Sequence, residues 1–131
     1  MKGLLNLTPH DITVFKENGE KVVIPSSGTL RLAEEVLGTE EVEGVECVRK
    51  RFTGVDIELR EGITADGVRV IVVSGISGMM FALSSEFRSE LFRKIGGEVS
   101  IIAPDTGPQS VIKDEKGRIV GVRRFCRYEV G

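Results

Sequence analysis

The sequence has few of the side chains that bind metals or form disulfides. It contains two cysteines, Cys47 and Cys126, one histidine, His10, and no tryptophan. Cysteines this far apart, with a single histidine, do not make a zinc-binding pattern, so we predict no metal ligands and no cofactor. We expect both cysteines to be free thiols. The alternative is a disulfide between a mid-chain strand and the C-terminal strand, a bond that is unusual inside cells except in hyperthermophiles.

Net charge and long apolar runs are also lacking. The formal net charge is −2, and no apolar run approaches the roughly 18 residues of a membrane helix. The first residues do not form a secretory signal. With 40% hydrophobic and 29% charged residues, the composition is that of one folded domain, residues 1–131. We expect an intracellular protein without a membrane partner, and the bulk charge gives no reason to expect nucleic acid as a partner.

Catalytic motifs are scarce. A Ser-His-Asp or Cys-His mechanism would have to use His10, which precedes Asp11 in a predicted turn. The glycine-rich stretch 74–78 matches neither a phosphate-binding P-loop nor the Gly-x-Ser-x-Gly nucleophile elbow, and we predict that it is a flexible connector. We assign no catalytic residue. A small hydrolase or nucleotide-processing enzyme that uses His10 with Asp11 or Asp105 is an alternative.

Short stretches rich in β-branched residues recur along the chain between turns. The clearest turn is Asn18-Gly19, which suits a type I′ hairpin. Residues 68–73 are predicted to be a buried central strand because β-branched side chains fill their second half. Gly121 indicates a bulge or the close approach of another backbone. Further predicted strands include 4–7, 12–15, 21–24, 45–52, 55–59, 99–102, 110–112 and 118–125.

One helix is predicted at residues 84–95. A serine begins it, Glu86 lies in its first turn, Arg93 and Lys94 lie in its last turn, and Gly96 follows. Apolar residues recur on one face at spacings of three and four. Together with the strands, this helix predicts an α+β domain: an antiparallel-rich, twisted or barrel-like sheet of about eight strands with one main helix.

Residues 34–46 contain six glutamates and no base, and Arg49-Lys50-Arg51 follows them. An acidic run of this kind is typical of a solvated face or loop. We expect the basic triplet to neutralise part of it. Glu43-Gly44 is predicted to be a hairpin turn.

Two compact polar loops, 6–11 and 104–110, are the candidate binding site. Pro104 and Pro108 restrict the second loop, and a rigid loop with exposed amide groups can bind an anion. The alternative is that 104–110 is only a corner between strands. We expect the two loops to meet on a common patch. The predicted ligand-binding residues are Asn6, Thr8, His10, Arg31, Asp105, Thr106 and Arg123.

Five motifs carry a resemblance to known proteins. They are Asn6-Leu7-Thr8-Pro9-His10, Ile24-Pro25-Ser26-Ser27-Gly28 with Arg31, Ala103-Pro104-Asp105-Thr106-Gly107-Pro108, Lys113-Asp114-Glu115 and Gly121-Val122-Arg123-Arg124-Phe125. Together they resemble a family of small proteins of tailed phages, prophages and archaeal viruses, and the length and style resemble a product of a Pyrobaculum spherical virus. The resemblance covers both ends of the chain but not residues 34–66. It implies a viral origin, a host-cytoplasmic location and a hyperthermophilic setting, and it carries no catalytic residues.

These observations predict a non-enzymatic viral binding protein that acts on a host protein or on a small anionic, nucleotide-like ligand. Besides the hydrolase, the other alternative is a virion structural or nucleic-acid-binding protein. That alternative depends on the basic and aromatic segment 118–128, which could contact phosphates and stack on bases.

Overall fold

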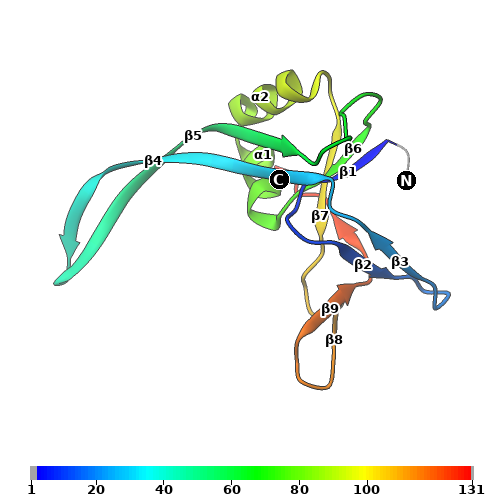
Figure 1. Ribbon diagram of the computed structural model, residues 1–131. Coiled ribbons are helices and arrows are strands. Elements are labelled where there is room, and N and C mark those ends of the chain that lie inside the picture. Colours follow the sequence, from blue (N-terminus) through cyan, green and yellow to red (C-terminus); the bar gives the residue numbers. More distant parts are fainter. Residues whose placement is uncertain (1–2, 131) are drawn as a thin grey trace.

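The computed structural model describes residues 3–130, which form a mixed α+β protein with three separate sheets and two helices (Figure 1). The first two sheets and the helices make up the body, and the third sheet is a long ribbon that projects from it. The elements are β1 (Leu4–Asn6), β2 (Ile12–Phe15), β3 (Lys21–Ile24), β4 (Gly28–Val42), β5 (Val45–Leu59), β6 (Val70–Val72), α1 (Gly75–Leu83), α2 (Ser85–Ile95), β7 (Ser100–Pro104), β8 (Val111–Lys113), β9 (Ile119–Val122) and β10 (Phe125–Cys126).

The core sheet has the strand order β1-β6-β7-β10. β1, β6 and β7 run parallel, and β10 pairs antiparallel with the end of β7. Ile71, Val72 and Val73 are fully buried, which confirms the predicted central strand. β-branched residues suit this place because a parallel strand is covered on both faces. The buried cluster around it consists of Leu5, Leu7, Leu30, Val55, Ile71, Val73, Phe81, Leu91, Ile95 and Val99.

The predicted helix is confirmed as α2. The Ser84 hydroxyl oxygen accepts a hydrogen bond from the Phe87 amide at 3.3 Å, which makes Ser84 the N-cap. Gly96 ends the helix in the left-handed conformation, with φ of 97°.

A second helix, α1, begins inside the stretch predicted to be a flexible connector, so that prediction is wrong. Ser74 caps α1 by accepting a hydrogen bond from the Ser77 amide. Gly78 is buried within α1, and a Cβ there would lie 3.1 Å from the Tyr128 ring. A glycine at this position therefore lets the C-terminal segment pack against the helix. No helix within residues 3–130 is long and apolar enough to cross a membrane.

The second sheet has the strand order β3-β2-β9-β8. The predicted hairpin at Asn18-Gly19 is confirmed, since β2 and β3 pair on either side of it. The turn is not of type I′, because Gly19 has φ of 84° but Asn18 has no positive φ. The expected close approach at Gly121 is also confirmed. A Cβ at this position would lie 2.6 Å from the Thr13 carbonyl oxygen and 2.6 Å from the Phe15 ring.

The third sheet contains only β4 and β5, which form one long antiparallel ribbon. Its base packs into the body, where Leu30 and Val55 are buried. Its outer part, residues 34–53, extends into solvent and is called the arm below (Figure 1). The predicted turn at Glu43-Gly44 is confirmed by φ values of 51° and 80°.

Three expectations need correction. The three sheets do not close into a barrel, and residues 3–130 form ten strands and two helices rather than about eight strands and one helix. The acidic run 34–46 is solvated, as expected, but it is strand and turn rather than loop. Cys47 lies exposed on the arm and Cys126 lies in β10, and both are free thiols. The alternative disulfide is therefore not formed.

Candidate functional site

The first predicted loop, 6–11, is held by a buried asparagine. The Asn6 side-chain amide donates to the carbonyl oxygens of His10 at 3.0 Å and Ile24 at 3.1 Å. Its side-chain oxygen accepts from the amide and hydroxyl of Thr8 at 3.0 and 2.7 Å. Asn6 is completely buried, and its side-chain polar atoms form hydrogen bonds that hold the loop in place. The Asp11 carboxylate accepts from the Ser26 amide, which ties the loop to the segment before β4.

The second predicted loop, 104–110, is held against β9 and β10. The Arg124 guanidinium donates to one Asp105 carboxylate oxygen at 2.6 Å, and the Gly107 amide donates to the other at 3.0 Å. Buried Ser110 accepts hydrogen bonds from the amides of Arg123 and Arg124 at 3.2 and 3.3 Å.

The two loops are therefore fixed by different parts of the chain: the first by residues 24–28, the second by residues 123–124. Among the predicted ligand-binding residues, Asn6, Thr8 and His10 form one network. Asp105 belongs to the other, together with Arg124, which was not among the predicted residues. Arg31 is exposed on β4, opposite Asp56 of β5. Exposed Thr106 and Arg123 line different cavities.

The hydrogen bond from Arg124 is the main reason why the pKa of Asp105 lies below its usual value, and the Gly107 amide adds to it. We predict that Arg124→Ala raises the pKa of Asp105, as measured by carboxyl NMR titration. Asp114 is the internal control, since its lowered pKa depends first on the Arg118 amide. Because the folded-state pKa is depressed, the contribution of Asp105 to stability is present above its unfolded-state pKa of about 3.9 and is lost as pH falls through the folded value. An unchanged Asp105 titration in the variant would contradict this account.

One cavity, of about 580 Å³, lies between the end of β2 and the second loop. Its charged lining residues are Lys16, Glu17, Arg123 and Arg124. Lys16 pairs with Glu20 at 3.9 Å and Arg124 pairs with Asp105 at 2.6 Å, so Arg123 is the cation of this lining that forms no ion pair within residues 3–130.

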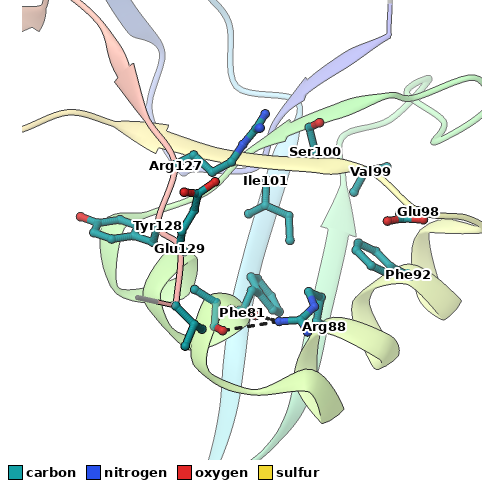
Figure 2. Close-up of a pocket in the computed structure, with 13 residues that line it drawn as sticks. Phe81, Arg88, Phe92, Glu98, Val99, Ser100, Ile101, Arg127, Tyr128 and Glu129 are labelled. Atoms are coloured by element: carbon teal, nitrogen blue, oxygen red, sulfur yellow. Dashed lines mark hydrogen bonds between the residues drawn. The ribbon is translucent and has the colours of Figure 1, made fainter.

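A second cavity, of about 510 Å³, lies between the helices, β7 and the C-terminal segment (Figure 2). Arg88 of α2 donates to the Phe81 carbonyl oxygen of α1 at 2.7 Å and so joins the two helices. The pKa of the Tyr128 hydroxyl is raised, first by its electrostatic interaction with nearby Cys126 and then by burial. The raised pKa favours the neutral phenol.

Catalysis by His10 finds little support in this geometry. The two carboxylates that could assist it are both hydrogen-bonded elsewhere: Asp11 to the Ser26 amide, Asp105 to Arg124 and Gly107. No group of three or more His, Cys, Asp or Glu side chains among residues 3–130 is arranged to hold a metal ion. The hydrolase alternative stays a prediction.

The arm is the surface that sequence reasoning missed. Its outer residues are exposed on both faces of the ribbon, and they include large apolar side chains. Val36, Leu37, Val42, Val45, Val48 and Phe52 are between 40% and 67% exposed. Phe52 also makes an edge-to-face contact with Phe87 of α2, with ring centroids 6.4 Å apart. The exposed apolar residues of the arm therefore start where the ribbon meets α2 and extend toward its tip.

The arm also carries the whole acidic run and the whole basic triplet. Lys50 pairs with Glu34 at 3.0 Å, and Arg51 pairs with Glu35. The expected neutralisation is thus confirmed for these two pairs. Within residues 3–130, Glu40, Glu41 and Arg49 form no ion pair.

No protein-family model, curated protein or solved structure matches the chain. The resemblance to viral proteins stays a prediction, and so do the viral origin, the host-cytoplasmic location and the hyperthermophilic setting.

Proposed function

We propose that this protein is a non-enzymatic binding protein whose partner is another protein chain and whose binding surface is the arm. The observation that supports this most strongly is the exposed apolar surface of a two-stranded ribbon that no other element covers within residues 3–130. By the strand register, Val36, Val48 and Phe52 lie on one face of the ribbon, and exposed apolar side chains on a common face mark interaction sites in soluble proteins.

The energetics of a two-stranded ribbon support the same proposal. An isolated hairpin is at best marginally stable in water. Each outer edge also presents backbone N–H and C=O groups that have no partner strand. A strand added from another chain would pair these groups, and its side chains would bury part of the neighbouring apolar side chains, at about 25 cal/mol per Å² removed from water. A partner that is itself a protein chain would therefore stabilise the arm most.

Shortening the arm tests this proposal. Glu35 and Arg51 lie directly opposite each other, so an Asn-Gly dipeptide can replace residues 36–50 and close the ribbon with a two-residue turn. We expect the shortened protein to keep its fold, since Leu30 and Val55 remain, and to lose every stable protein contact that the full chain makes. Sedimentation of the purified chains and affinity capture with each as bait would measure this.

Circular dichroism and thermal melting of both chains provide the control for folding. If the full and shortened chains sediment alike and capture the same proteins, the arm is not the binding surface and the proposed function is wrong.

The cavity lined by Arg123 supports a second candidate, a small anionic ligand. Lys16 and Arg123 lie in one lining, and Arg123 forms no ion pair within the described residues. We expect a nucleoside monophosphate at about ten times its Kd to raise the Tm by about 5 °C, because binding to the folded state adds about 1.4 kcal/mol. Arg123→Ala should abolish the shift, whereas Lys113→Ala, outside this cavity, should leave it intact. A shift that is equal in both variants would place the ligand elsewhere.

A further inference from the structure

We infer that the partner of the arm is a second copy of this chain, added head-to-tail so that β4 of one copy lies beside β5 of the next. The inference rests on the proposed function, whose partner it names. It follows from the open edges of the arm and from the way charge is divided between them.

Both edges of the arm are available for pairing. β4 and β5 form a sheet of two strands, and no third strand pairs with either of them within residues 3–130. Each strand of the arm is about 30 Å long at the usual rise per residue. Because alternate residues of a strand direct their N–H and C=O groups outward, each edge offers a series of donors and acceptors along this length.

The two edges carry opposite charge. The β4 half of the arm, residues 34–42, contains four glutamates and no base, whereas the β5 half contains Arg49, Lys50 and Arg51 with Glu46 as its acid. The ion pairs inside the chain use Glu34 and Glu35. In the arm, Glu40 and Glu41 then remain unpaired on β4, and Arg49 and Glu46 remain unpaired on β5. Glu46 lies opposite Glu41, whereas Arg49 lies on the other face of the ribbon, which it shares with Glu40. On that face an acid remains on one edge and a base on the other.

A head-to-tail arrangement brings these remaining charges together. Strands then alternate β4, β5, β4, β5, all antiparallel, as in the hairpin itself. In the hairpin, Glu40 lies opposite Cys47 and Gly38 lies opposite Arg49. A slide of two residues between neighbouring copies places Glu40 opposite Arg49 and keeps every side chain on its own face of the sheet. Opposite charges in directly facing positions stabilise strand pairing.

Two-fold pairing of identical edges is disfavoured by the same charges. Full antiparallel overlap of the β4 halves places Glu35 opposite Glu41, and full overlap of the β5 halves places Arg49 opposite its own copy. Like charges in facing positions destabilise a sheet. The charges therefore select a heterologous interface, in which each copy contributes a different edge and the assembly closes into a ring or extends.

Charge reversal on single edges tests the inference with the full-length protein. We expect the wild-type chain to sediment as multiples of 14.3 kDa, with slowed amide hydrogen exchange in the arm. Glu40→Arg and Arg49→Glu should each weaken association by about tenfold or more, because each creates facing like charges between identical copies. An equimolar mixture of the two variants should regain association, since every interface can then join unlike residues. Glu115→Arg, on the exposed turn between β8 and β9, is the control and should associate like the wild type.

Each other result overturns the inference. Stronger association of the Glu40→Arg variant would indicate two-fold pairing of β4, and failure of the mixture to recover would show that the two edges do not meet. A wild-type chain that stays monomeric at every concentration would exclude a second copy as the partner. In that case the arm is still a binding surface if the full chain captures a different protein that the shortened chain does not capture. Failure of the second-copy inference can therefore be distinguished from failure of the proposed function.

Discussion

Gly28→Ala is expected to lower the free energy of unfolding by about 3 kcal/mol, because it introduces a clash that no side chain can relieve. Gly28 begins β4 and pairs with Leu59 at the end of β5. A Cβ at position 28 would lie 2.2 Å from the Glu58 carbonyl oxygen and 2.9 Å from the Leu59 Cα. Both atoms belong to the main chain, so the base of the ribbon has to open to admit the methyl group.

Urea denaturation followed by circular dichroism would measure the effect. Gly97→Ala is the matched control: it makes the same chemical change at a position where a Cβ meets no atom within 4 Å. We expect the control to change stability by less than about 1 kcal/mol. Equal transitions in the two variants would contradict the packing described at the base of the arm.

Local backbone chemistry explains which parts of the fold the sequence could predict. The hairpin at Asn18-Gly19, the capping of α2 by Ser84 and Gly96, and the close approach at Gly121 each depend on residues within a few positions of one another or on the special geometry of glycine. Signals of this kind are present in the sequence itself, and the structure confirms all of them.

The long ribbon could not be predicted in the same way, because its stability depends on residues far apart in the chain. The glutamates of β4 are poor strand formers, and they are accommodated by Lys50 and Arg51 on the neighbouring strand. Two strands, 45–52 and 55–59, are predicted where the structure has one, since β5 continues through Gly54. A Cβ at position 54 would lie 3.2 Å from the Glu90 carboxylate, so this glycine allows α2 to pack closely against the ribbon.

Only part of the candidate site could be predicted from the sequence. Polar residues beside a proline indicate an exposed loop, and His10 and Thr106 are indeed exposed. Asn6, in contrast, is buried because carbonyl groups from His10 and Ile24 converge on its side chain, and Ile24 is distant in the sequence. The residues of the arm lie outside the motifs that carry the viral resemblance, so nothing in those motifs indicated a binding surface there.

Asn6→Ala is expected to lower the free energy of unfolding by about 3–5 kcal/mol. The substitution leaves the Ile24 carbonyl oxygen without the Asn6 donor and the Thr8 amide without its acceptor, and a buried polar group that loses its hydrogen bond costs about 1–3 kcal/mol. The His10 carbonyl oxygen still accepts from the Thr8 hydroxyl at 3.0 Å. Asn18→Ala is the control, because Asn18 makes its hydrogen bond in an exposed turn. Chemical denaturation of both variants provides the comparison.

Asn6→Asp separates the loss of the donor from the loss of side-chain volume. The aspartate keeps an acceptor for Thr8 but places a second oxygen against two carbonyl oxygens, so its ionised form is unfavourable there. Its folded-state pKa is then raised above the unfolded value, and stability is retained at low pH and lost as pH rises through the folded-state pKa. We therefore expect the aspartate variant to be less destabilised at pH 4 than at pH 7, relative to the parent chain at each pH. A deficit that is independent of pH would show that the side-chain amide is not the group that holds this loop to the end of β3.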